Sequence, residues 1–311
     1  YPTIDLTLKE VEKLKFLQSR MMKILSKTKI SDGAKNIDKV SSTSKCDPLV
    51  LFEDYYSKDN EHCGIGGKHT SQMFIKSKHG KHGTLKAILV PREDYEIIDN
   101  WHVYGLKGTG SKRIKVDNAF VPNYRIHYLK DAFISKSPGN KTNPGPLYKL
   151  PFGQVFTHSV AIPSLGAYKG ALESFIDGAK SRISSFGVEA KTNPLTSALI
   201  AEATLEIDQM WNTLEANFKV MMDAVNSSKE ININDRIKFR HQVGVINDRC
   251  VAGALKLVKA SGGASVYLGH NVMNKFIDIM TTQVHVANIS DPFAIDYGSS
   301  VLGGETENLM L

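Results

Sequence analysis

The protein has 311 residues, of which 41% are apolar and 23% are charged, and its formal net charge is +7. This composition is ordinary for globular proteins and excludes wholesale disorder, while the length is sufficient for two domains with their own cores. No apolar run reaches the length of a bilayer span and no signal peptide is visible, so we expect neither a membrane partner nor secretion.

The cysteines and the basic residues exclude two further classes of function. The three cysteines, Cys46, Cys63 and Cys250, are odd in number and widely spread, and they show no metal-binding spacing. We therefore expect no metal site and a reduced, cytoplasmic protein. The densest basic stretch, residues 76–83, has glycines at its turns and no interleaved aromatic side chains. This pattern favours a solvated hairpin loop, and we expect no nucleic-acid partner.

Residues 1–60 contain one convincing helix. Thr7 and Glu10 have the spacing of a capping box, and apolar side chains repeat at helical spacing over residues 8–21. We expect a reduced N-terminal helical segment here, either shortened or incomplete. The second alternative is kept because the sequence does not begin with Met.

Residues 61–134 are predicted to form a small antiparallel β domain. Short alternating or β-branched runs are separated there by glycine or proline, which is typical of strands joined by tight turns. The expected strands are Met73–Ile75, Leu85–Val90, Tyr95–Ile98 and Arg113–Val121. Residues 135–150, rich in proline and glycine, are expected to be a linker.

Residues 151–311 are predicted to be helical. Long amphipathic segments with short joins favour an antiparallel four-helix bundle. The expected helices are Phe156–Phe186, Pro194–Val225, Asp235–Ala260 and Val266–Ala287, followed by a short helix over Asp291–Leu302. The predicted fold class is therefore α+β, with a small antiparallel β domain followed by a C-terminal four-helix bundle.

Trp101–Ser111 is the segment with the clearest chemical content. It reads Trp-His-Val-Tyr-Gly-Leu-Lys-Gly-Thr-Gly-Ser and places a large aromatic ring ahead of three glycines and two hydroxyls. An aromatic face, bare backbone N–H groups and hydroxyls suit a flat, polar, phosphate-bearing cofactor. An ordinary turn is the alternative, since Gly-Thr-Gly-Ser makes a good turn on any protein.

This segment resembles a known signature. Trp-x-x-x-Gly-Leu-Arg-Gly-Thr-Gly-Ser, followed by a Val-Asp-Asp-Val-Phe-Val-Pro strand, marks the oxygenase component (group D) of flavin-dependent two-component monooxygenases, which have the acyl-CoA dehydrogenase fold. Here the strand reads Val116–Pro122. Three later segments also resemble motifs of this family, in the same order. They are the Gly-Gly-x-x-x-Tyr turn at Ser261–Tyr267, the Asp…His-Val-Ala pattern from Asp278 to Ala287, and a closing Gly-x-x-x-Leu-Gly at Gly298–Gly303.

The resemblance implies a specific activity. A separate reductase supplies reduced FMN or FAD, which reacts with O2 on this component. A flavin hydroperoxide then transfers one oxygen atom to a small organic, often aromatic, substrate. The flavin carries the redox chemistry, while the protein positions it and excludes water. The resemblance also implies a homotetramer.

The resemblance assigns roles to the residues of the Trp101–Ser111 segment. Ser111 and Thr109 match hydroxyls that bond the N5 edge of the flavin, and Ser111 is expected to be catalytic. Trp101, Gly108 and Gly110 complete the expected cofactor-binding loop.

Three residues of the helical half complete the expected site. His285 matches the family's active-site histidine, and it could take a phenol proton when neutral or stabilise a peroxide anion when charged. Arg240 and Arg249 are candidate anchors for the flavin phosphate, and a solvated helix face is the alternative for each.

The chain departs from the family pattern at three arginines and at its beginning. Lys107 keeps the charge of the motif arginine without its planar fork, and Ile277 and Ser299 replace two others. The family also has a longer helical domain before the β domain. Two alternatives therefore stay open. One is an acyl-CoA dehydrogenase-like flavoenzyme, for which Glu305 and Glu307 lie outside the usual motif context. The other is a non-catalytic paralogue that binds flavin or assembles with an active partner.

Overall fold

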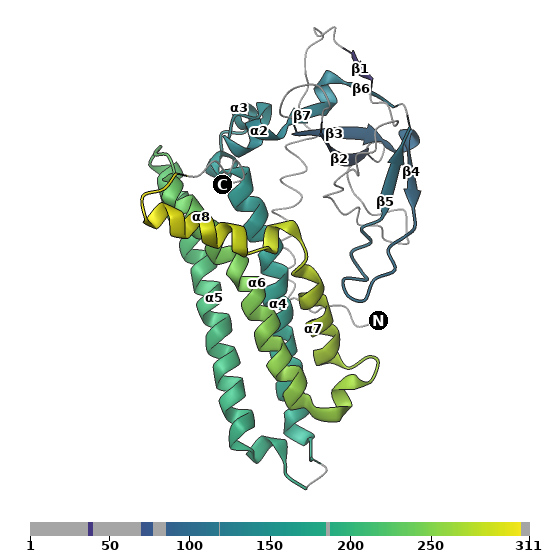
Figure 1. Ribbon diagram of the computed structural model, residues 1–311, viewed down its shortest axis with the longest axis vertical. Helices are drawn as coiled ribbons and strands as arrows, with labels where there is room; N and C mark the ends of the chain where they lie inside the picture. The colour runs from purple at the N-terminus through teal and green to yellow at the C-terminus, as the bar shows by residue number, and fades with distance from the viewer. Residues whose placement is uncertain (1–36, 40–69, 77–84, 118, 185–186, 306–311) are drawn as a thin grey trace. The chain divides into compact units, whose positions relative to one another are not determined.

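The computed structural model describes residues 37–39, 70–76, 85–117, 119–184 and 187–305. The chain divides into two compact units, with the strands before Asn143 and the long helices after Pro144 (Figure 1). The helix predicted near the N-terminus and most of the basic stretch lie outside the described residues.

The first unit consists of small antiparallel sheets, as the sequence predicts. Strand β3 (Leu85–Pro91) is central to one sheet, with β2 (Thr70–Lys76) and β7 (Ile126–Tyr128) on either side. Strand β4 (Tyr95–Ile98) pairs with β5 (Arg113–Val116), and β1 (Ile37–Lys39) pairs with β6 (Phe120–Pro122). The core of the unit comprises Ile88, Val90, Tyr95, Ile114, Ala119 and Val121.

The structure corrects one prediction for this half of the chain in detail and adds to another. The expected strand Arg113–Val121 is divided into β5 and β6, because β5 pairs with β4 whereas β6 pairs with β1. The expected linker contains the helix α3 (Pro138–Thr142), which begins on a proline, a residue well suited to a first helical turn. A further short helix, α2 (Leu129–Phe133), follows β7.

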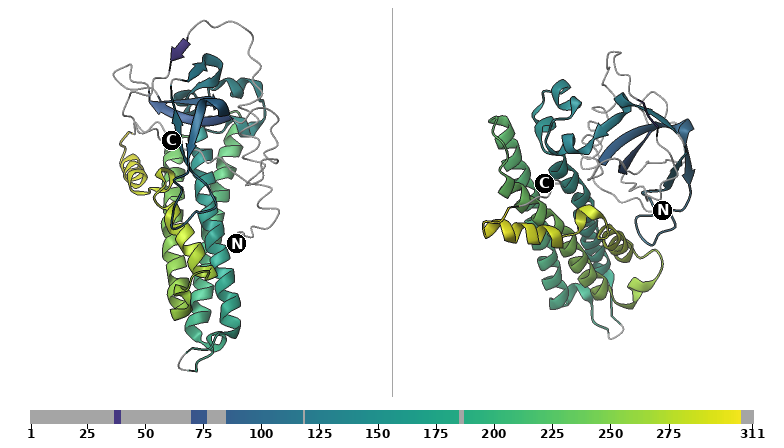
Figure 2. Two further views of the ribbon diagram at one scale, coloured as in Figure 1. Left: turned by 90° about the vertical axis from the view of Figure 1, so that its right-hand side faces the viewer. Right: turned by 45° about the horizontal axis from the view of Figure 1, so that its top comes forward.

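The second unit is built from long helices that share one core. They are α4 (Phe152–Ser181), α5 (Pro194–Asn226), α6 (Ile233–Ser261) and α7 (Asn271–Thr282), followed by α8 (Asp291–Val301). Helix α4 packs against α5, α6 and α7, while α6 also packs against α8. Figures 1 and 2 show α4, α5 and α6 running side by side along their length. None of the helices in the described ranges is long and apolar enough to cross a membrane.

Helix α7 is much shorter than the predicted helix Val266–Ala287. Gly262–Val266 forms a separate 3₁₀ helix, Gly269 has a φ of 86°, and the side chain of His270 caps the first turn. A positive φ interrupts a right-handed helix, which explains the late start. At the other end the chain leaves the helix after Thr282, so His285 lies in a loop and not on a helix.

The contact between α4 and α6 depends on a glycine. Tyr168 is only 1% exposed, and its hydroxyl donates a hydrogen bond to Glu206 Oε2 at 2.9 Å. A Cβ at Gly253 would collide with that hydroxyl. The close approach of the two helices therefore requires a residue without a side chain at this position.

We expect Gly253→Ala to lower the free energy of unfolding by about 1–3 kcal/mol, because the added methyl group overpacks this contact. Gly178→Ala on α4 is the matched control, since a Cβ there meets nothing within 4 Å. That change should raise the free energy of unfolding by about 0.5–1 kcal/mol through helix propensity. Urea unfolding followed by circular dichroism measures both, and a Gly253→Ala protein as stable as wild type would contradict the packing.

Candidate functional site

The loop between β4 and β5 contains the whole Trp101–Ser111 segment. Its base is closed by two interactions. Asn100 Oδ1 accepts the backbone N–H of Arg113 at 3.0 Å, and Lys112 Nζ lies 3.0 Å from Asp99 Oδ1. The antiparallel pairing of β4 with β5 continues directly into this closure, so the loop projects from a fixed base.

The carbonyl oxygen of Leu106 organises the loop. It accepts hydrogen bonds from Trp101 Nε1 at 3.0 Å, from the backbone N–H of Thr109 at 3.1 Å and from Thr109 Oγ1 at 2.9 Å. Leu106 has a φ of 56°, a left-handed conformation that costs a residue with a side chain about 1–2 kcal/mol. The three hydrogen bonds to one oxygen offset that cost.

These bonds determine what the loop offers to a ligand. The indole N–H of Trp101 points back into the turn, so it is already used as a donor. The hydroxyl hydrogen of Thr109 is also used within the turn, which leaves its oxygen as an acceptor. A Cβ at Gly108 would meet nothing within 4 Å, while Gly110 has a φ of 68° that favours glycine. Ser111 is partly buried at the end of the same loop.

His285 lies in the helical unit, in the loop between α7 and α8. It caps the 3₁₀ helix Val286–Asn288, since its Nδ1 accepts the backbone N–H of Ala287 at 3.1 Å. A ring nitrogen that accepts a hydrogen bond carries no hydrogen, so the neutral ring bears its proton on Nε2. Burial, and secondly the charge of Arg240, lower the pKa of His285. The geometry therefore favours a neutral Nε2–H donor over a proton acceptor.

Arg240 is buried, contrary to the expected alternative of a solvated helix face. Its side chain is 1% exposed because its face of α6 is covered by α8, where the ring of Phe293 lies 3.6 Å from the guanidinium carbon. Within the described ranges, its Nε and Nη1 have no hydrogen-bond partner. Burial lowers the pKa of Arg240 to about 10, so the group is still a cation at neutral pH.

A second histidine, His158 on α4, was not singled out by the sequence. It is fully buried, with Nδ1 2.6 Å from the carbonyl oxygen of Gln154 and Nε2 3.4 Å from Asn217 Nδ2. Nδ1 must donate to the carbonyl, which leaves Nε2 as an acceptor for the amide. Burial lowers the pKa of His158 to about 4, and the nearby charge of Arg240 acts in the same direction.

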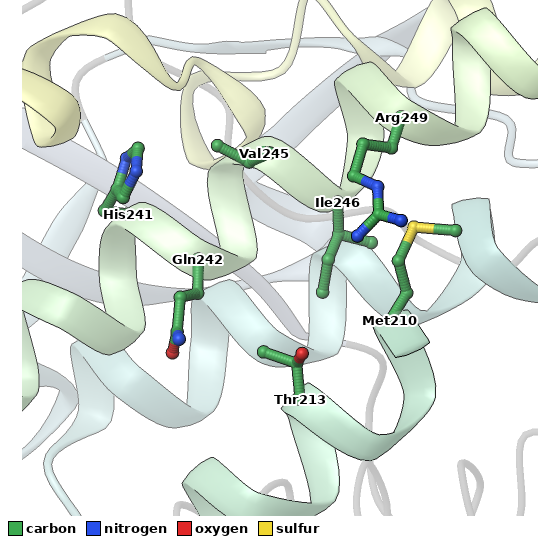
Figure 3. A pocket seen from close by; sticks show the side chains of 7 residues that line it. All are labelled: Met210, Thr213, His241, Gln242, Val245, Ile246 and Arg249. Atoms are coloured by element: carbon green, nitrogen blue, oxygen red, sulfur yellow. The ribbon is translucent and has the colours of Figure 1, made fainter. Parts of the chain in front are cut away.

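Arg249 lines an open pocket of about 240 Å³ between α5 and α6 (Figure 3). Its side chain reaches α5, where Nη2 donates to Gln209 Oε1 at 3.0 Å. The pocket is lined by Met210, Thr213, His241, Gln242, Val245, Ile246 and Arg249. The lining thus includes the cation of Arg249 and the hydroxyl of Thr213.

The expected site residues thus form three groups. Trp101, Gly108, Thr109, Gly110 and Ser111 lie together in the loop of the β unit. Arg240 and His285 lie within electrostatic range of each other in the helical unit, whereas Arg249 lines a pocket there. Across the described part of the chain, no group of three or more potential metal ligands is present.

The depressed pKa of His158 predicts a loss of stability in acid. A folded-state pKa of about 4, below the ordinary value of 6.5, means that folding favours the neutral ring. The stabilisation is present above pH 6.5 and is lost as the pH falls towards 4, by about 3 kcal/mol in all. We expect His158→Gln to lose correspondingly less stability than wild type between pH 7 and 4 in urea unfolding.

His102→Gln serves as the control, because the side chain of His102 is exposed. Its stability should follow the pH dependence of wild type. Parallel pH profiles for wild type and His158→Gln would contradict the assignment of a buried, neutral ring to His158.

Comparison with known proteins gives a consistent family. Residues 158–289 match the family model "Acyl-CoA dehydrogenase, C-terminal domain". The chain is 30% identical to a protein named flavin-dependent monooxygenase, oxygenase subunit HsaA, of Rhodococcus jostii, over 73% of this chain and 60% of that protein. It is also 30% identical to the HsaA subunit of Mycobacterium tuberculosis, over 82% of this chain and 66% of that protein.

The fold agrees with this relationship. The crystal structure of the 3-HSA hydroxylase from Rhodococcus sp. RHA1 matches with a TM-score of 0.71 and 26% identity, over 79% of this chain and 68% of that one. The chain spans 60% to 66% of the length of the two relatives. It belongs to the family of flavin-dependent monooxygenase oxygenase subunits, which have the acyl-CoA dehydrogenase fold.

Proposed function

We propose that this chain is the oxygenase component of a two-component flavin-dependent monooxygenase that hydroxylates an aromatic or other small organic substrate. The observation that carries the proposal is the compact turn at Leu106, which holds an aromatic ring and a hydroxyl acceptor in one loop. When bound, reduced FMN or FAD from a separate reductase supplies two electrons to O2. One oxygen atom then enters the substrate and the other leaves as water.

The loop fits a flavin in shape and in hydrogen-bonding chemistry. An aromatic ring such as that of Trp101 suits a flat ring system, and the open space at Gly108 allows close approach of a ligand to the backbone. The acceptor oxygen of Thr109 and the hydroxyl of Ser111 suit a polar ring edge. For the flavin phosphate, Arg249 in its open pocket is better suited than Arg240, which is almost fully buried.

In this proposal His285 acts as a hydrogen-bond donor. Its Nδ1 is occupied by the N–H of Ala287, so the proton of the neutral ring is held at Nε2. The nearby cation of Arg240 disfavours a second proton on the ring. His285 then donates to an oxygen on which negative charge develops, and the charge of Arg240 stabilises the same anion through space.

We further propose that the described helices α4 to α7 form the four-helix bundle of the fold, and that residues 61–134, 135–150 and 151–311 act as β domain, linker and bundle. The reduced N-terminal segment, residues 1–60, is proposed as a separate part. The protein is proposed to act as a cytoplasmic homotetramer. Support for assembly comes from exposed apolar side chains around the start of α7 and the end of α8, namely Val266, Tyr267, Leu268, Val301 and Leu302.

The assembly can be tested at its most exposed apolar side chain. We expect Leu268→Glu to lower the molar mass measured by light scattering, because a charge would be buried without a partner in the interface. Lys180→Glu, at an exposed position of α4, is the control and should leave the molar mass unchanged. An unchanged molar mass for Leu268→Glu would show that Leu268 does not lie in an assembly interface.

The activity can be tested by mixing the protein and photoreduced FMN or FAD with oxygenated buffer. We expect wild type to slow flavin reoxidation relative to free flavin and to suppress the release of hydrogen peroxide. His285→Asn should keep flavin affinity and the cap on Ala287, but accelerate reoxidation by on the order of 10²-fold, because the donor at Nε2 is lost.

The control is His270→Asn, which preserves a capping acceptor at the start of α7 and should behave as wild type. Reoxidation by wild type no slower than that of free flavin would rule out the oxygenase. Reduction of bound oxidised flavin by an acyl-CoA would instead identify a dehydrogenase. Wild-type kinetics in His285→Asn would remove His285 from the mechanism.

A further inference from the structure

The loop that carries His285 is held by side chains of α6. Residues 283–290 connect α7 to α8 and contain no regular structure except the short 3₁₀ helix at Val286–Asn288. Such a segment has few backbone hydrogen bonds of its own, so its position depends on contacts made by its ends.

Asp248 contacts both ends of this loop. Its Oδ1 accepts a hydrogen bond from Gln283 Nε2 at 2.7 Å, and its Oδ2 accepts one from Ser290 Oγ at 2.7 Å. Hydrogen bonds to a carboxylate are short and about twice as strong as neutral ones. One side chain thus fixes a point on either side of His285.

Neighbouring residues of α6 complete the attachment. Asn247, which is fully buried, donates from Nδ2 to Thr282 Oγ1 at 2.6 Å and to Ser164 Oγ at 2.8 Å. A Cβ at Gly244 would lie 3.1 Å from Ser290 Cα, so the loop backbone rests directly on the helix. Residues three and four apart share one helix face, and positions 244, 247 and 248 therefore form a single binding face for the loop.

The loop is also braced from within. Asn288 Nδ2 donates to the carbonyl oxygen of Thr282 at 2.9 Å, across the residues that include His285. Thr282 is itself bonded to Asn247, so this internal brace is joined to α6. The backbone that carries His285 is therefore held both by the α6 face and by this internal brace.

We propose that Asp248 is a positioning residue for His285, fixing the imidazole by holding both ends of its loop against α6. Asp248 makes no contact with His285 and acts through Gln283 and Ser290. A displacement of about 1 Å at a reacting group can cost 10²-fold in rate. The effect on turnover rests on the proposed oxygenase function, whereas the effect on the loop does not.

Hydrogen exchange tests the attachment without any activity. In Asp248→Ala, we expect amide exchange across residues 283–290 to rise at least tenfold, because both tethers are lost, while α4 stays protected. Ser290→Ala removes one tether and should give a smaller rise, which keeps the test valid if Asp248→Ala folds poorly. Asp208→Ala, at an exposed position of α5, is the matched control. Unchanged exchange in both loop variants would overturn the proposal.

A double-mutant cycle tests the action through His285. Asp248→Ala alone should accelerate reoxidation of reduced flavin on the order of tenfold, below the effect of removing the donor itself. In a His285→Asn background the same change should add less than about twofold, since the residue it positions is already lost. If the effects of the two substitutions on the reoxidation rate instead multiply in the double variant, Asp248 has only a structural role.

The two kinds of failure are distinguishable. If wild type does not slow flavin reoxidation, the oxygenase function fails while the exchange result still decides the attachment. Suppose instead that wild type does slow flavin reoxidation, and that Asp248→Ala has a loosened loop but the same reoxidation rate as wild type. The positioning role then fails and the oxygenase function stands.

Discussion

A polar group removed from water must find a partner, and in the helical unit this constraint applies to α6 as well as to α4. The buried surface of α6 carries Arg240 and Asn247, and Asp248 follows on the same side. Asn247 Nδ2 is bonded to Thr282, the last residue of α7, and Asp248 is bonded to Gln283 and Ser290 at the ends of the 283–290 loop. The path of that loop is thus dictated by groups that the helix would otherwise leave unsatisfied.

Arg240 is compensated differently. It lies over the ring of Phe293, an attraction of about 0.5–2 kcal/mol that offsets only part of the free energy of burying a cation. Its positive potential bears on His158 and on His285, and in both it disfavours the protonated ring. The hydrogen bonds at Nδ1 select opposite tautomers, with Nδ1 donating in His158 and accepting in His285. Burial, one nearby buried charge and two backbone contacts together therefore determine the protonation of these two histidines.

The regular parts of the fold follow from local patterns in the sequence. Tyr95–Ile98 is a strand as expected, and Pro194 begins a long helix as expected, because periodicity and turn chemistry are local. The division of Arg113–Val121 between two sheets was not predictable, since it depends on which distant strand pairs with each half. The early end of the helix before His285 was not predictable either, and the last residue of that helix, Thr282, is bonded to the distant Asn247.

The candidate site was predictable where its residues are contiguous. The Trp101–Ser111 segment carried its own signal, and it does form one hydrogen-bonded loop. The contact of Arg240 with Phe293 and the hydrogen bonds of Asp248 join residues that are tens of positions apart. Spacing within the sequence therefore could not predict them. A charged residue on an amphipathic helix is normally solvated, which is why the sequence did not predict the burial of Arg240.

The turn at Leu106 has a consequence for the thermodynamics of cofactor binding. Its three hydrogen bonds converge on one carbonyl oxygen and all come from within the loop, so the turn forms before any ligand arrives. A preorganised loop does not lose further conformational entropy when it receives a rigid ring. In the proposed oxygenase, which would capture a diffusing reduced flavin and later release the oxidised form, this favours fast exchange without refolding of the binding surface.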